Sequence, residues 1–347
     1  MGRFKLSRSL ELSQHLRWVG KSLIFSAIFI AGFTNSLQAQ LGAAGSFLRL
    51  GIGARAKAMG DAYTALARGI EASYYNPAGL PFLDKKEVVV SYRVLSLDRQ
   101  FTYLGFGVPI RPKVAAGEQT INGGLALTWI HAGVSNIDGR DSDGGHSEDL
   151  SNSENAFMLS FGLRPTQKLA LGLSVKVILN RFPNVGISGE TVSANGVGFD
   201  FGALFTPNDW LSLGVVVKDI NSKYRWNTQD IYGENGSETI DKIPKSIRTA
   251  IAIKMPRMKS VTLAVDVEQF FKSRVFKDRI DTRVHMGVQG VVRQNIVLRG
   301  GLDDGSLTAG GGYQFKVFGK TGQLNYAFSA PGNRPEEDHV FTWVFQF

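Results

Sequence analysis

The chain has 347 residues, 40 of them glycine, and a formal net charge of +9. It contains no cysteine, which excludes disulfide bonds and thiol chemistry. Nowhere do about 18 apolar residues follow one another, so membrane-spanning helices are excluded as well.

Residues 1–39 have the pattern of an export signal. Five basic residues precede an apolar run from Ser22 to Phe33, and Leu37-Gln38-Ala39 follows it. This order predicts a signal peptide that is cleaved after Ala39, because the alternative, a membrane anchor, needs a longer apolar run. Cleavage removes five basic residues and one acidic residue, which leaves a formal charge of +5. So modest a charge on an exported protein gives no support to nucleic-acid binding.

Residues 40–85 lack regular alternation and are rich in small residues. Alanine and glycine recur at close spacing between Ala54 and Ala67, which predicts a tightly packing helix. The stretch Asn76-Pro77-Ala78-Gly79-Leu80 predicts a turn, because Pro77 fixes its own φ and keeps Asn76 out of the helical region. Such a segment fits inside a barrel as a plug, and an exposed periplasmic helix is the alternative.

From residue 86 onward, the sequence alternates apolar residues with small or polar ones. Between Leu169 and Leu179 every second residue is Leu or Val, and the residues between them include Gly172 and Lys176. A period of two predicts β-strands. We predict fourteen of them, at 86–95, 100–110, 121–131, 155–164, 168–179, 196–206, 210–219, 247–255, 260–269, 281–291, 295–302, 306–316, 322–329 and 339–347.

The connections between these strands mostly alternate between long and short. Segments 132–154 and 220–246 are long and polar, whereas 165–167 and 207–209 are tight turns. Outer-membrane barrels have short periplasmic turns and longer external loops, and a secreted sandwich, the alternative, gives no reason for this alternation. The segment 111–120 and the brief loops near residues 97 and 304 depart from the pattern. We predict an all-β fold, a 14-stranded antiparallel transmembrane β-barrel over residues 86–347, with its apolar faces against outer-membrane lipid.

Several charged residues fall on the polar faces of the predicted strands, which would line the lumen. His285 and Arg283 face the acidic residues of the preceding strand, so we expect a network of lumen charges there. The predicted lumen charges are Lys176, Asp200, Asp266, Glu268, Arg283 and His285.

The last predicted strand carries aromatic residues on one face: Phe341, Trp343, Phe345 and the terminal Phe347. This row resembles the C-terminal signal by which the barrel-assembly machinery recognises outer-membrane proteins. The alternative is an ordinary aromatic strand.

No group of residues in the sequence has the pattern of a catalytic site. Gly51 to Ala56 mimics a dinucleotide-binding fingerprint, but no βαβ unit surrounds it. The acidic residues Asp138, Asp141, Asp143 and Glu148 do not have EF-hand spacing, so we prefer a solvated acidic loop to a calcium site. The four histidines after residue 39 show no metal-ligand spacing and no partner nucleophile. We therefore expect a non-enzymatic protein with no metal and no cofactor.

Residues 53–80 resemble the PorV/PorQ-like outer-membrane proteins, relatives of the FadL long-chain fatty acid transporters. The resemblance implies a small N-terminal helical hatch over residues 40–85, with an Asn-Pro-Ala motif at its end. Asp61 departs from the pattern, since it follows Gly60 where a second small residue is expected. The residues that carry the resemblance are Gly53, Arg55, Met59, Gly60, Asn76, Pro77, Ala78, Gly79 and Leu80.

The resemblance implies work in type IX protein secretion, with secreted proteins or secretion subunits as partners. The loops 132–154 and 220–246 would carry those contacts, and Tyr224 and Trp226 are the exposed aromatics expected to anchor them. The alternative is a FadL-like channel for uptake of hydrophobic small molecules. A third interpretation is a barrel that only anchors other envelope proteins.

Overall fold

The computed structural model describes residues 44–112, 121–141, 143–185, 189–256, 258, 260–271, 280–332 and 337–347. The predicted signal peptide, residues 1–39, lies outside the described residues. Among the residues described, no helix has both the length and the apolar character needed to cross a membrane.

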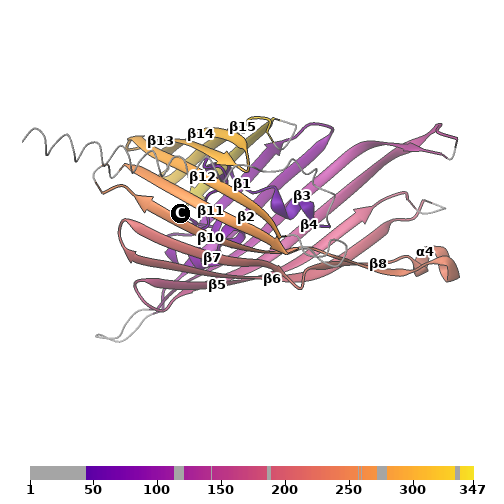
Figure 1. Cartoon of the computed structure of the whole chain (residues 1–347), viewed down its shortest axis with the longest axis horizontal. Coiled ribbons are helices and arrows are strands. Elements are labelled where there is room, and N and C mark those ends of the chain that lie inside the picture. Colours follow the sequence, from indigo (N-terminus) through magenta and orange to yellow (C-terminus); the bar gives the residue numbers. More distant parts are fainter. Residues whose placement is uncertain are drawn as a thin grey trace, which may run out of the picture. The chain divides into compact units, whose positions relative to one another are not determined.

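The strands form one closed antiparallel barrel (Figure 1). Among the described residues, sixteen strands share a sheet, and two of them, β8 and β9, form a side hairpin attached to β6. The other fourteen close into a ring, because β1 pairs with β16 at one seam and β5 pairs with β6 at another. The prediction of a fourteen-stranded barrel is confirmed. The ring strands are β1 Glu87–Val94, β2 Arg99–Ile110, β3 Asn122–Arg140, β4 His146–Arg164, β5 Leu169–Phe182, β6 Val192–Asn208, β7 Leu211–Ile220, β10 Lys245–Lys254, β11 Val261–Phe271, β12 Ile280–Arg293, β13 Ile296–Asp303, β14 Ser306–Val317, β15 Lys320–Ser329 and β16 Asp338–Gln346.

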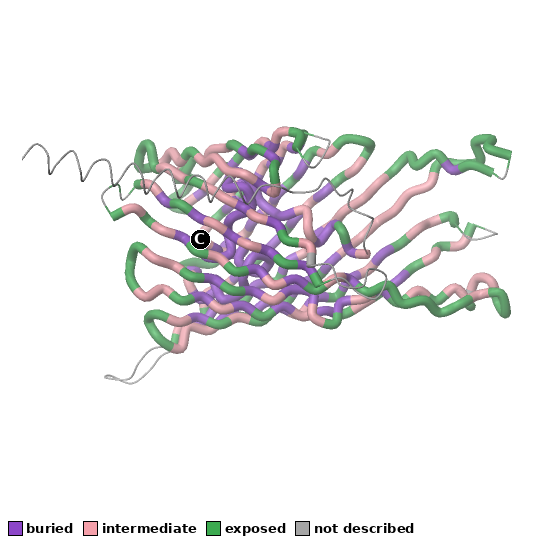
Figure 2. The backbone as a smooth tube through the Cα atoms, viewed as in Figure 1, coloured by how far each residue is buried: buried purple, intermediate pink, exposed green. Residues whose placement is uncertain are grey.

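The outer face of the barrel is apolar. Leu127, Leu159 and Phe201 are each at least half exposed, whereas their sequence neighbours Ala126, Met158 and Asp200 are buried. Figure 2 shows this alternation as short buried and exposed stretches that follow one another along each strand. An apolar face that is turned outward is the pattern of a barrel in lipid.

Two of the long connections contain regular structure. The predicted loop 132–154 is wrong, because β3 and β4 continue to pair to Arg140 and His146, past a register shift between Val134 and Ile137. The predicted loop 220–246 contains the hairpin of β8 Lys223–Asn227 and β9 Glu238–Lys242, with α4 Gln229–Tyr232 and η3 Gly233–Asn235 between them. In Figure 1, β8 and α4 lie beyond the end of the barrel wall.

The segment before β1 folds as short turns. It contains η1 Ser46–Arg49, α2 Ala54–Lys57, α3 Ala72–Tyr75 and η2 Pro77–Phe82. The predicted continuous helix is wrong, because Gly60 (φ 64°) and Asp61 (φ 60°) are left-handed and end the helical turn.

This segment, residues 44–83, is called the hatch below. Helix α2 contacts β14, β15 and β16, whereas η2 contacts β2 to β6 across the ring, so the hatch lies within the barrel. The alternative of an exposed helix is therefore wrong.

Candidate functional site: the hatch and the lumen wall

Asn76 joins the hatch to the barrel. Its backbone is extended (φ −165°), as the following proline requires. Its side-chain oxygen accepts a hydrogen bond from Ala78 N at 3.1 Å and so caps η2. Its amide donates to Thr64 O within the hatch at 3.2 Å and to Ala203 O of β6 at 3.1 Å. The Asn-Pro turn therefore ends one helix, begins the next, and attaches both to the wall.

Glycines of the lumen wall, meaning the inward face of the ring strands, let the hatch backbone approach closely. A Cβ on Gly202 would lie 2.1 Å from Asn76 Oδ1, and one on Gly172 would lie 2.2 Å from the carbonyl carbon of Pro77. On β12, four strands along the ring from β6, a Cβ on Gly287 would lie 2.3 Å from Met59 O. No side chain fits at these distances, so the wall glycines are part of the hatch site.

An acid-rich network holds the middle of the hatch. Asp266 of β11 accepts hydrogen bonds from the backbone N–H groups of Tyr63 at 3.2 Å and Thr64 at 2.9 Å. Lys57 of the hatch lies 3.1 Å from Asp61 and 2.5 Å from Asp303 of β13. Asp266 thus accepts hydrogen bonds from two backbone N–H groups of the hatch, which a longer helix would have bonded to its own carbonyl groups.

Histidine and arginine side chains complete this network. His285 Nδ1 lies 3.1 Å from Gly60 O of the hatch and 3.0 Å from Asp303 Oδ1. Arg248 forms an ion pair with Glu268 and donates to Asp61 O at 3.1 Å. Buried charges are tolerated only when they are paired and hydrogen-bonded, and these are.

The six predicted lumen charges are all buried, and the structure divides them into separate groups. Asp266, Glu268 and His285 meet in the network above, and the pairing register places Asp266 opposite His285 and Glu268 opposite Arg283. Arg283 lies farther from carboxylates, at 3.7 Å from Asp281 and 3.8 Å from Asp304.

Lys176 and Asp200 form a second group in the lumen with Asp219 of β7. Lys176 Nζ lies 2.8 Å from Asp200 Oδ1 and also contacts Asp219, whose N–H donates to Asp200 at 2.8 Å.

The hatch residues named from sequence have different roles. Gly53 is needed locally, because it has φ 72° and a Cβ there would lie 1.9 Å from Glu71 Oε1. Met59 and Gly60 contact wall glycines, and Pro77 to Leu80 contact β3 to β6. Arg55 takes no part in the acid-rich network and instead lies 5.3 Å from the ring of Tyr63.

The predicted loop aromatics are less accessible than expected. Tyr224 is 1% exposed and donates its hydroxyl to Glu154 at 2.8 Å, so it does not offer a partner contact. Trp226 is half-buried and donates Nε1 to Asp241 at 2.9 Å. The sequence could not show this, because both residues lie on a strand that packs against β6.

At the C-terminus, Trp343, Phe345 and Phe347 are exposed on the outer face, and Phe341 is half-buried.

In the acidic hairpin tip, Asp138 pairs with Arg140 at 2.6 Å and with His146 at 2.8 Å, while Asp141 accepts a hydrogen bond from Gly145 N at 2.8 Å. Within the described part of the chain, no three acidic or histidine side chains are arranged to hold a metal ion.

Sequence reasoning missed several partners in the network. Lys57, Asp61 and Glu87 are buried, and Glu87 accepts from Ile70 N of the hatch at 2.9 Å. Arg248 and Asp303 occupy inward positions of β10 and β13. For Arg248, its position two residues from the buried Ser246 was the available signal, whereas Asp303 is the single buried residue of β13 and had no such neighbour.

A cluster of buried apolar side chains fills part of the barrel interior. They come from the hatch, from the inward faces of β1 to β6 and β16, and from the segment 220–246. The members include Phe47, Leu48, Ile52, Tyr74, Tyr75, Phe101, Tyr103, Ile130, Met158, Ile178, Tyr224 and Ile243. A water-filled porin has a polar interior, so this part of the lumen differs from a porin.

Comparison with known proteins agrees with this architecture. No family model matches the chain, and no curated protein matches it. Among solved structures, it is similar to the P. putida toluene transporter TodX, with a TM-score of 0.55 and 14% identity over 86% of this chain and 99% of that one. It is also similar to the monoaromatic hydrocarbon channel CymD, with a TM-score of 0.56 and 13% identity over 86% and 98% of the chains. A Pseudomonas aeruginosa FadL homologue matches with a TM-score of 0.55 and 12% identity over 82% and 95% of the chains. The structural neighbours of this barrel are thus FadL-type transporters and channels.

Proposed function

We propose that the protein is an outer-membrane channel for hydrophobic small molecules. The cluster of apolar side chains that the hatch and the lumen wall share carries this proposal, because a hydrophobic solute that enters it when the hatch moves is favoured over a polar one. The fold supports it, since toluene and monoaromatic hydrocarbon channels have the same architecture. The hatch is part of this cluster and fills the lumen there, so passage requires the hatch or the wall to move.

Uptake of radiolabelled toluene tests the proposal in cells whose own hydrocarbon channels are deleted. Expression of the chain should raise uptake above that of cells with an empty vector. Met158→Ala enlarges the apolar interior and should raise uptake further. Leu159→Ala is the matched control, because Leu159 is the next residue and is 52% exposed on the outer face. Equal uptake with and without the protein contradicts the proposal.

A second candidate is a PorV/PorQ-like role in type IX secretion. The hairpin of β8 and β9 favours it, because this hairpin extends from the barrel and every residue of β9 is exposed. Deletion of residues 223–242 should then abolish co-purification of a secreted protein or secretion subunit while the barrel remains folded. The outward aromatic row of β16 supports the further proposal that this strand is read by the assembly machinery.

A further inference from the structure

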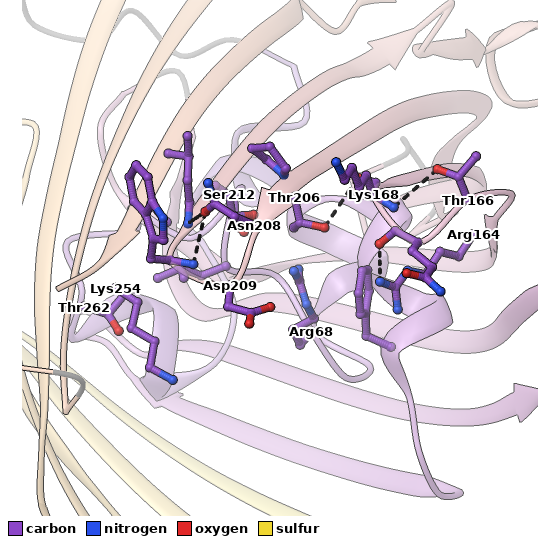
Figure 3. A pocket seen from close by; sticks show the side chains of 18 of the residues that line it. Arg68, Arg164, Thr166, Lys168, Thr206, Asn208, Asp209, Ser212, Lys254 and Thr262 are labelled. Atoms are coloured by element: carbon purple, nitrogen blue, oxygen red, sulfur yellow. Dashed lines mark hydrogen bonds between the residues drawn. The ribbon is translucent and has the colours of Figure 1, made fainter. Parts of the chain in front are cut away.

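A cavity of about 990 Å³ opens at the end of the barrel that carries the tight turns (Figure 3). Its lining includes Arg55 and Arg68 of the hatch, Arg164 and Lys168 beside the β4–β5 turn, and Lys254 at the end of β10. One acidic residue, Asp209, also lines it. In the view of Figure 3, Arg68 lies between Lys254 and Arg164. Five cations and one carboxylate give this cavity a strongly positive lining.

These cations differ from the other buried basic groups of the lumen. Lys57, Lys176 and Arg248 each form ion pairs with carboxylates. None of the five cavity cations forms an ion pair with a carboxylate of the residues that the structure describes. Like charges gathered in a partly enclosed space repel one another, so this arrangement favours a bound counter-ion.

The guanidinium groups still have unused donors. Arg55 Nε and Arg164 Nε are buried and have no hydrogen-bond partner among the described residues. Arg68 and Arg164 both lie against the ring of Phe82, with Cζ at 4.0 and 4.7 Å from its centroid. Packing against one ring restricts the two groups, which reduces the entropy lost when a ligand binds.

Several neutral polar groups of the cavity are already used within the fold. Thr166 Oγ1 accepts from Leu169 N at 3.0 Å, and Asn208 Oδ1 accepts from Leu211 N at 2.9 Å. Ser212 Oγ donates to Ala65 O at 2.8 Å. Recognition of a ligand therefore falls mainly to the cations.

We propose that this cavity binds a phosphate group. Arginine forks match phosphate oxygens in a bidentate manner, and a group with more than one negative charge suits five cations better than a single carboxylate does. The phosphate belongs either to a small anion from solution or to a lipid headgroup. Since Arg55 and Arg68 belong to the hatch and the other three cations belong to the wall, the bound anion also ties the hatch to the wall. This site goes beyond the proposed transport of hydrophobic molecules and does not depend on it.

Calorimetric titration of the full chain in neutral detergent tests the site, with pyrophosphate as the probe. The wild type should bind, and added salt should weaken the binding. Lys168→Gln/Lys254→Gln changes two exposed side chains, which leaves the packing intact, and should lower affinity at least about tenfold, as should Arg68→Gln. Lys245→Gln is the matched control, because Lys245 is an exposed lysine at the other end of β10. Affinity that is the same in all four proteins, or no binding to the wild type, overturns the proposal.

Reconstitution distinguishes the two sources of phosphate. In vesicles that contain phosphatidylglycerol, pyrophosphate should bind more weakly than in phosphatidylcholine vesicles if a headgroup occupies the cavity, and equally well if the natural ligand comes from solution. Both results keep the phosphate site. Toluene uptake is measured on the same variants: uptake without pyrophosphate binding leaves only the transport proposal standing, and binding without uptake leaves only the phosphate site.

Discussion

Replacing Asp266 with alanine should loosen the middle of the hatch. The Asp266 carboxylate is 0% exposed and accepts the backbone N–H groups of Tyr63 and Thr64, at 3.2 and 2.9 Å. Hydrogen bonds to a charged acceptor contribute about 1.5–3 kcal/mol each, so the loss of both should cost at least about 3 kcal/mol locally. That lowers the free energy of local opening and should speed hydrogen exchange of the two amides by roughly a hundredfold.

Hydrogen exchange resolved to single residues measures this effect. The Ile70 amide is an internal control, because it donates to Glu87 and not to Asp266. Gln269→Ala is the matched variant, since Gln269 lies on the same strand with its side chain exposed. Unchanged exchange at Tyr63 and Thr64 in Asp266→Ala would refute the reasoning. An equal acceleration at Ile70 would show instead that the hatch opens as one unit.

Three other substitutions have definite expected results. Asn76→Ala removes the three hydrogen bonds that link η2, Thr64 and β6, and should lower the free energy of unfolding by about 2–4 kcal/mol in a denaturant titration. Leu298→Lys places a charge on the outer face and should cost about 2–4 kcal/mol in lipid, whereas Leu97→Lys, in an exposed turn, should cost almost nothing. The Asp138 carboxylate raises the pKa of His146 above 6.5, and His146 with Arg140 lowers the pKa of Asp138. The pair is therefore present at pH values between the two pKa values and is lost as the pH rises through that of His146. An NMR titration should show the His146 midpoint fall in Asp138→Asn but stay raised in Arg140→Gln, and an unchanged midpoint in Asp138→Asn would exclude the carboxylate as the cause.

The strands could be predicted closely from sequence because two solvents act on their two faces. Where a strand separates lipid from lumen, residues that face lipid alternate with residues that face the lumen, and this alternation marks the strand in the sequence. The pattern predicts β10 at 247–255, and the strand lies at Lys245–Lys254. Outside the lipid this constraint ends: residues Ser135 to Asp138 of β3 are exposed on both faces, so the sequence gives no periodic signal for the extension of this hairpin. The β8–β9 hairpin was missed for the same reason.

The hatch was less predictable, because its partners come from distant strands. Its alanines fit a helix locally, yet Tyr63 and Thr64 donate to Asp266, about two hundred positions away in sequence. Asp61, which departs from the family pattern, has a clear structural role. It forms an ion pair with Lys57 at 3.1 Å and accepts a hydrogen bond from the Tyr75 hydroxyl at 2.7 Å. Such long-range pairing cannot be read from spacing along the chain, although the inward parity of the wall carboxylates marks the candidates.

The seam between β1 and β16 constrains the order of assembly. Its eight residue pairs join the beginning of the ring to the end of the chain, and the hatch precedes β1 directly. Gly172, Gly202 and Gly287 surround the hatch so closely that it has no free passage into a finished ring. During assembly, the hatch must therefore be in place before β16 pairs with β1. A barrel that closes before the hatch is inside would remain empty.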